Sequence, residues 1–338
     1  MPTLDIFNND AFSAVELSAA INVVPNNFGR VGELNLFKPK SVRTTSVAIE
    51  INNGVLNLLP QTQRGGPASV NKTGKRSVKN FNVPQFALED VIQAADIQNV
   101  RAFGSETELE QVQDVVNERL AELSLKHDIT REWLRVGALR GVLLNDDGTT
   151  LLDLFSEFGV TQKVVDFALG TATTDVPGKC REINRYMELN LKGDTMKYVH
   201  CLASSAFLDK LFLHPLVREA YVYQMGQSML RDDVRKNFTF QNILFEEYLG
   251  SATDKDGNER KFIPDGDARF FPVGTNSTFI DHSAPADFME TVNTPGLPKY
   301  AKVAVDAKFQ RFVDLHTQMN PLPICMRPAL LVRGWSSN

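Results

Sequence analysis

The stretch SETELEQVQDVVNERLAELSLKHDITREWLRVGALRG, residues 105–141, predicts one long helix on which the rest of the fold depends. Ser105 and Glu108 form an S-x-x-E capping box at its start, and Gly141 stands where a left-handed C-cap residue is expected. A continuous helix of this length would span about 50 Å, because each residue adds about 1.5 Å. Such an element serves as a spine for other elements, and nothing in it indicates catalysis.

Apolar residues keep helical spacing along the stretch, but they lie on two different faces. The first stripe is Leu109, Val112, Val116, Leu120 and Leu123, and the second is Leu125, Ile129, Trp133 and Val136. The stripes meet near Asp128 to Arg131, where a kink or a break into two helices is the alternative to one continuous helix. The shift predicts that each half packs against a different part of the protein.

Composition indicates an ordinary globular protein and excludes several function classes. A chain of 338 residues favours two domains, and its net charge of −5 argues against nucleic-acid binding by the whole surface. No signal-peptide pattern opens the chain and no apolar run approaches the roughly 20 residues of a membrane span, so we expect synthesis in the cytoplasm. Cys180, Cys201 and Cys325 lack paired spacing, which disfavours a disulfide framework or a zinc ribbon.

Positive charge is concentrated in one N-terminal segment. No Asp or Glu occurs from Ile51 to Leu88, whereas the segment contains the basic residues Arg64, Lys72, Lys75, Arg76 and Lys79. Alternating apolar residues from Val47 to Ile51 predict a strand that leads into it, and Val55 to Leu59 could return. We interpret the segment as a long basic loop or open hairpin suited to an acidic surface, such as a neighbouring copy of this chain. The alternative is an ordinary solvated loop.

The flanking segments carry weaker signals. Residues 1–40 indicate an extended arm or a disordered terminus, with one short helix possible from Phe12 to Val24. Phe86 to Ile92 is predicted to lead into a short helical segment. Asp147-Gly148 between apolar runs predicts a β-hairpin directly after the long helix. Residues 175–280 alternate helical and strand patterns and form a second lobe, whereas the strands predicted in 300–334 are expected to return to the long helix.

No pattern in the chain predicts a catalytic, cofactor or metal site. P-loop, dinucleotide-binding and nucleophile-elbow motifs are absent, and the five histidines are scattered. His200 lies within a predicted buried strand, where a core role is expected. Asp254, Asp256, Asn258 and Glu259 superficially resemble a calcium loop, but the glycine has the wrong offset and a hairpin tip fits better. A chain of this length without a coherent site favours a structural protein over an enzyme.

The order of these elements resembles the lambda-type major capsid protein E family of tailed phages. Short motifs fall at the matching places: Arg64-Gly65-Gly66 in the basic loop, Ala138 to Gly141 at the end of the long helix, Lys261 to Asp265 after the Asp-Gly loop, and the proline-rich strand Pro321 to Leu331. The resemblance covers about Ser41 to Arg333. Each motif is weak alone, and their order carries the resemblance.

The resemblance implies an α+β, Hong Kong-type capsid fold with four parts. These are an N-terminal arm (1–40), an extended loop (41–88), a peripheral domain with the spine helix (89–170, completed by 296–338) and an axial domain (171–295). It implies a subunit that self-assembles into an icosahedral head shell around double-stranded DNA. Arg64, Gly65, Gly66, Lys72, Lys75, Arg76 and Lys79 would then make contacts between subunits.

The resemblance also implies partners: other copies in pentamers and hexamers, a scaffolding protein, a portal, a possible decoration protein and DNA bound without sequence specificity. No cofactor is implied. Some phages of this fold crosslink a loop lysine to an asparagine, for which Lys72, Lys75 or Lys79 and Asn320 are the candidates here. Two alternatives stay open. One is an encapsulin-like compartment, and the other is a cytoplasmic two-lobe enzyme with an unrecognised site.

Overall fold

The computed structural model describes residues 12–23, 29–52, 76–93, 96, 108–224, 238–306, 308 and 311–338. The chain divides into two compact units, each assembled from three separate segments. Unit 1 comprises Met1–Val47, Asn82–Leu134 and Asp281–Pro323, and unit 2 comprises Ala48–Phe81, Arg135–Ile280 and Ile324–Asn338. No helix in the described segments is long and apolar enough to cross a membrane.

The predicted spine is one helix, α4, from Glu108 to Arg140. Its 33 residues correspond to about 50 Å, and the helix is continuous through residues 128–131, so the alternative of two separate helices is excluded. Gly141 ends it with φ of +85°, and its N–H donates to the carbonyl of Ala138 at 3.2 Å. The left-handed C-cap predicted at Gly141 is therefore confirmed. The Ser105 capping residue lies outside the described residues.

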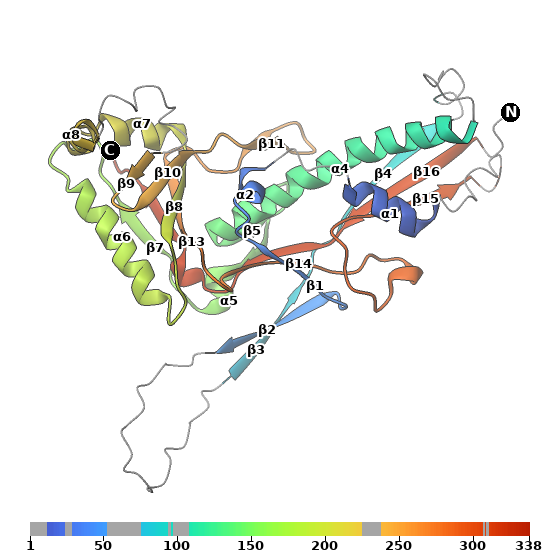
Figure 1. The fold of residues 1–338 in the computed structure, drawn as a ribbon, viewed down its shortest axis with the longest axis horizontal. Helices are drawn as coiled ribbons and strands as arrows, with labels where there is room; N and C mark the ends of the chain where they lie inside the picture. The colour runs from blue at the N-terminus through green and yellow to red at the C-terminus, as the bar shows by residue number, and fades with distance from the viewer. Residues whose placement is uncertain are drawn as a thin grey trace, which may run out of the picture. The chain divides into compact units, whose positions relative to one another are not determined.

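Unit 1 contains a three-stranded antiparallel sheet in the order β15-β16-β4 (Figure 1). The strands are β4 (Phe86–Gln93), β15 (Tyr300–Val305) and β16 (Phe312–Met319), and they come from distant parts of the sequence. Phe86 to Ile92 is therefore a strand. Asp96, shortly after it, is helical, and the rest of the short helical segment predicted to follow lies outside the described residues. Alternate side chains of β4 are more buried, as expected for a strand with one covered face.

Helix α1 (Ala14–Val23) packs with α4 on this sheet. Ile21 of α1, Leu120 of α4 and Leu315 of β16 belong to one buried cluster. Ser18 fixes the contact, since its hydroxyl accepts from the N–H of Ala301 at 3.0 Å. The short helix predicted near 12–24 is confirmed. Residues 12–23 are therefore not disordered, because they are folded on their own chain, whereas the assignment of residues 1–40 to an N-terminal arm remains a prediction.

Buried polar side chains in the middle of α4 hold other segments of unit 1. Glu132 accepts from the backbone N–H groups of Val31 and Gly32 at 2.7 and 3.1 Å, which attaches the short helix α2 (Arg30–Glu33). Arg131 donates to Asp281 Oδ2 at 2.9 Å. These contacts explain why the middle of the spine is polar yet buried.

Unit 2 is built on a six-stranded mixed sheet in the order β7-β18-β13-β8-β10-β9. The strands are β7 (Lys163–Asp166), β8 (Tyr198–Ala203), β9 (Phe238–Phe240), β10 (Ile243–Glu247), β13 (Asp267–Val273) and β18 (Val332–Trp335). The pairs β10–β8 and β18–β7 are parallel, whereas β10–β9, β13–β8 and β13–β18 are antiparallel. Strands β9 and β10 form a hairpin at the edge of this sheet.

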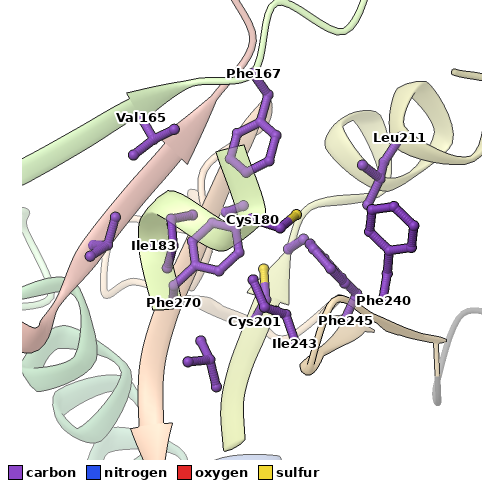
Figure 2. Packing of buried hydrophobic residues seen from close by; sticks show 14 of the residues in the cluster. Val165, Phe167, Cys180, Ile183, Cys201, Leu211, Phe240, Ile243, Phe245 and Phe270 are labelled. Atoms are coloured by element: carbon purple, nitrogen blue, oxygen red, sulfur yellow. The ribbon is translucent and has the colours of Figure 1, made fainter. Parts of the chain in front are cut away.

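The core of unit 2 fills the space between this sheet and three helices, α6 (Val176–Asn190), α7 (Ser205–Leu213) and α8 (Pro215–Gln224). Figure 2 shows Ile183 and Cys180 of α6 close to Phe270 of the sheet. Phe167 stacks on Phe270 with 5.8 Å between ring centroids. These three helices confirm the helical patterns predicted within residues 175–280.

The C-terminal strands are divided among three sheets, which differs from the prediction. Residues 300–334 were expected to return together to the long helix, but only β15 and β16 join the sheet of unit 1. Strand β18 lies between β7 and β13 in the sheet of unit 2. Strand β17 (Pro321–Cys325), together with β1 (Lys38–Ser41) and β14 (Phe279–Ser283), forms a separate sheet in the order β1-β14-β17.

Two hairpins and one short helix complete unit 2. The predicted hairpin after the spine is confirmed as β5 (Val142–Leu144) paired with β6 (Thr150–Asp153). Helix α5 (Leu154–Phe158) follows directly, and its N-cap Asp153 accepts from the N–H groups of Phe155 and Ser156. The second hairpin pairs β11 (Ser251–Thr253) with β12 (Glu259–Lys261).

Candidate intersubunit surfaces

The basic segment begins and ends in a two-stranded ribbon. Strand β2 (Ser46–Asn52) pairs with β3 (Arg76–Asn82), and Figure 1 draws them as a ribbon. The strand predicted from Val47 to Ile51 is confirmed. Its partner among the described residues is β3, while the return predicted at Val55 to Leu59 lies outside them.

The base of the ribbon is fixed to helix α5 within unit 2. Lys79 Nζ lies 3.0 Å from Glu157 Oε2 and also donates to the Glu157 carbonyl. Next to this ion pair, the ring of Phe81 stacks on Phe158 with 6.1 Å between centroids. Phe81 is buried, so the apolar contact contributes more stability than the half-exposed ion pair. The ribbon therefore has a defined attachment point next to the hairpin that follows the spine.

The predicted intersubunit residues differ in what the structure says about them. Arg64, Gly65, Gly66, Lys72 and Lys75 lie outside the described residues. Arg76 is the first residue of β3, and Lys79 lies in its middle. Lys79 has an intrachain role through Glu157, and its contact with a neighbouring copy remains a prediction.

An acidic face runs along the N-terminal half of α4. Asp114, Glu118 and Glu122 are spaced four residues apart, which aligns them on one side of the helix, and all three are exposed. Arg119 and Lys126 lie 3.9 and 3.5 Å from Glu122. Asp114 and Glu118 have no ion pair within the described part of the chain. We call Asp114, Glu118 and Glu122 the acidic face of the spine.

Sequence reasoning did not single out this face, although its signal was present. The helix carries acidic residues at a period of four, namely Glu110, Asp114, Glu118 and Glu122. The same stretch also carries the two apolar stripes, which were the basis of the helix prediction. The anchoring role of Lys79 could not be anticipated, since it depends on a contact between residues 78 positions apart.

The histidines and carboxylates considered for chemistry have structural partners. His200 is fully buried, its Nε2 lies 3.1 Å from Glu246 Oε2, and its ring stacks on Phe271. Asp265 accepts from Lys261 Nζ at 2.8 Å at the surface. Burial lowers the pKa of His282. Among the described residues, no group of three or more His, Cys, Asp or Glu side chains could hold a metal ion.

The acidic loop near residue 254 is a hairpin tip, as predicted. Asp254 Oδ1 accepts from the N–H groups of Asp256 and Asn258 at 3.0 and 2.8 Å, and Oδ2 accepts from Arg260 Nε at 3.1 Å. The Asn258 hydrogen bond is the main reason that the pKa of Asp254 is lowered. The carboxylate oxygens are thus directed at the loop's own backbone and at Arg260.

Asn320, the candidate for a lysine crosslink, is buried and fully engaged. Its Nδ2 donates to the Pro285 carbonyl at 2.6 Å, and its Oδ1 accepts from Gln318 Nε2 at 3.0 Å. Crosslinking would require attack on the Asn320 amide carbon, and therefore disruption of both hydrogen bonds. The arrangement favours a structural role for Asn320.

Comparisons with known proteins agree with the resemblance seen in the sequence. The family model described as phage major capsid protein E matches residues 13–335. The major capsid protein of Pseudomonas phage KPP10 is 32% identical over 350 residues, which cover 98% of this chain and 99% of that protein. The major capsid protein of Salmonella phage Felix O1 is 26% identical, with 95% of each chain covered.

A solved structure supports the fold independently. The mature capsid of bacteriophage PhiM1 contains a chain that matches with a TM-score of 0.53 at 14% identity, covering 93% of this chain and 88% of that one. At this identity the match shows the fold alone, and the fold is the α+β, Hong Kong-type capsid fold that the sequence predicted. The chain therefore belongs to the phage major capsid protein E family and is a structural subunit of a phage head shell.

Proposed function

We propose that the subunits of this shell are joined by the basic loop of one copy lying on the acidic face of the spine of the next copy. The proposal rests on the opposite charges of the basic loop and the acidic face of the spine. The loop segment has five basic residues and no acidic one, whereas Asp114, Glu118 and Glu122 project from one side of α4. Complementary potentials of this kind direct association and fix its register.

The anchored base of the ribbon supports this role. A loop can join copies reproducibly only if its starting direction is the same in every subunit, because its far end otherwise samples many positions. Phe81 and Lys79 provide that direction through α5. Since the loop and the acidic face are different surfaces, the contact is heterologous and can continue around a ring.

The family fold suggests how the two units are used. We assign unit 1, with the spine and its three-stranded sheet, to the peripheral domain, and the six-stranded sheet of unit 2 to the axial domain that meets its copies in pentamers and hexamers. Of the predicted boundaries at 89–170, 171–295 and 296–338, we propose to change one: β18 is assigned to the axial domain, since it lies in the six-stranded sheet.

The remaining partners follow from what an icosahedral head requires. We propose assembly in the host cytoplasm with a separate scaffolding protein and a portal, followed by filling with double-stranded DNA that the shell contacts without sequence specificity. A decoration protein is a further candidate partner. The described contacts of His200, Asp265 and His282 supply no catalytic arrangement, in keeping with a purely structural role.

Charge reversal tests the proposed contact. Lys72→Glu, Lys75→Glu and Arg76→Glu together should abolish shells in negative-stain images while leaving the melting temperature unchanged, because like charges would then face each other. Lys79 stays unchanged in this variant because it anchors the ribbon. The matched control changes Arg185, Lys192 and Lys255 to Glu, which alters the net charge equally at exposed positions of unit 2.

A compensating variant makes the test specific. Asp114→Lys with Glu118→Lys should also prevent assembly, and combining these changes with the reversed loop should restore it. Shells that form normally from the reversed loop alone would exclude the proposed contact. Purified particles that contain a protein cargo and no DNA would instead favour the encapsulin-like alternative.

A further inference from the structure

Two arginines on neighbouring strands of the unit 2 sheet share one buried aspartate. Arg269 of β13 and Arg333 of β18 are directly opposite in an antiparallel pair, so their side chains leave the same face of the sheet. Arg333 donates from Nε and Nη2 to Asp267 Oδ1 at 3.0 and 2.8 Å, and Arg269 donates from Nη2 to Asp267 Oδ2. We call Asp267, Arg269 and Arg333 the arginine cluster.

The positive charge of the arginine cluster exceeds the negative charge that Asp267 supplies. Two guanidinium groups face one carboxylate, and like charges directly opposite each other in a sheet are unfavourable. The charge of Arg140, at the end of α4, also acts on Arg269. Burial is the main reason that the pKa of Arg269 is lowered to about 10; Asp267 opposes this change, and Arg140 and Arg333 add to it.

Arg269 is the least satisfied member of the cluster. Its side chain is only 8% exposed, and its Nε has no hydrogen-bond partner within the described residues. This Nε is itself buried, so Arg269 acts on an incoming group through its positive charge and not through that N–H. The side chain of Arg333 is 41% exposed and connects the cluster with solvent.

We propose that Arg269 and Arg333 bind a small oxyanion next to Asp267. Carboxylate and phosphate groups match the planar fork of a guanidinium, which donates two parallel hydrogen bonds to them. The oxyanion accepts from the N–H groups of Arg333 that Asp267 does not use, and the buried guanidinium of Arg269 adds positive charge behind it. Its source is either a free phosphate ion or a carboxylate side chain of a second copy of this chain, and the recognition chemistry is the same for both.

Thermal unfolding of the unassembled full-length subunit tests the site. Sodium phosphate and sodium acetate are each compared with sodium chloride at equal ionic strength, which separates binding from screening. We expect a saturable rise in melting temperature of about 2–4 °C with an oxyanion that binds only the folded chain. A rise with phosphate alone identifies free phosphate as the ligand, and a rise with acetate as well shows that the site also takes a carboxylate, the group that acidic side chains of a second copy carry.

Variants of the arginine cluster test whether it causes the rise in melting temperature. Arg333→Gln should remove the rise, whereas Arg181→Gln, an exposed arginine elsewhere in unit 2, should keep it. Arg333→Lys retains the charge but not the fork, and should reduce the rise if Arg333→Gln fails to fold. Equal rises in the wild type and the Arg333 variants, or no rise in the wild type, would overturn the proposal. Neither result affects the proposed function, because no assembled shell is measured.

Discussion

Asp128 and Lys299 form a buried ion pair in unit 1, with 2.7 Å between Asp128 Oδ1 and Lys299 Nζ and side chains that are 3% and 7% exposed. Lys299 Nζ also donates to Ser124 Oγ at 2.6 Å. The pair fixes the segment before β15 to the middle of the spine. Burial lowers the pKa of Lys299, with Asp128 opposing this change, so the ammonium depends on its partner.

Removing Asp128 should therefore be costly. Asp128→Ala leaves the Lys299 ammonium buried beside Ser124 alone, and we expect a loss of about 3–5 kcal/mol in the free energy of unfolding. Urea unfolding of the subunit measures it. The double variant Asp128→Leu with Lys299→Met removes both charges and should lose less than Asp128→Ala. A single variant that costs under about 1 kcal/mol would show that the pair does not hold this segment.

Replacing Gly141 should lower the stability of the subunit for two reasons, because both its backbone conformation and its surroundings require glycine. Its φ is +85°, and an added Cβ would lie 2.1 Å from Phe155 Cε2. Gly159 is the matched control, since its φ of +62° is also left-handed but nothing lies within 4 Å of its Cβ position. Gly159→Ala should cost roughly 1–2 kcal/mol from backbone strain alone. Gly141→Ala should cost about 3 kcal/mol or more, because overpacking is added.

The two anchors of the ribbon should differ in strength. Phe81 is 4% exposed against Phe158, so Phe81→Ala should reduce the free energy of unfolding by about 3–5 kcal/mol. The side chains of Lys79 and Glu157 are 39% and 44% exposed, and Lys79→Ala should cost less than about 1 kcal/mol. Urea titrations of the two variants compare them directly. Equal losses would contradict the prediction that the ring contact is the stronger of the two anchors.

The spine and the hairpin after it could be predicted because their signals are local. Gly141 ends the helix through its own backbone, and the Asp147-Gly148 turn needs no distant partner. The helix is continuous near Asp128, and the reason lies in contacts with residues far away in the sequence. Polar residues there interrupt the apolar stripe, but Asp128 and Arg131 are buried against Lys299 and Asp281 and so continue the packed face.

The misplaced elements depend on partners far away in the sequence. Phe86 to Ile92 forms β4 by pairing with β16, more than 200 residues later, and no local pattern identifies that partner. Similarly, β18 joins the unit 2 sheet because it fits between β7 and β13, which no local pattern encodes. The arginine cluster was missed for the same reason, since Arg269 and Arg333 meet only in the folded sheet.

The three cysteines should be unreactive until the chain unfolds. Burial raises the pKa of Cys180 and of Cys325 to about 12 and raises that of Cys201 well above its usual value. The thiolate is the reactive form, so a thiol reagent such as dithionitrobenzoate at pH 8 should label none of them in the folded subunit. In denaturant all three should react. Rapid labelling of the native protein would show that the core of unit 2 opens.

His127 should make the stability of unit 1 depend on pH in a defined window. It is 1% exposed, and its Nε2 lies 3.0 Å from Thr317 Oγ1. Burial, assisted by the charge of Lys299, lowers the pKa of His127 from 6.5 to about 4. The unfolded chain therefore takes up the proton more readily than the folded one. Above about pH 7, His127 should make no pH-dependent contribution to the free energy of unfolding. Between pH 6.5 and 4 its protonation in the unfolded chain should lower that free energy by roughly 3 kcal/mol in total.

A substitution at His127 isolates this effect from the other titrating groups. Asn at this position can still hydrogen-bond Thr317 but cannot take up a proton, so His127→Asn should flatten the loss of stability between pH 6.5 and 4. Parallel profiles for the wild type and His127→Asn would contradict the assignment, since the pH dependence would then belong to carboxylates. A flattened profile would identify His127 as the group whose burial against the sheet makes the spine sensitive to mild acid.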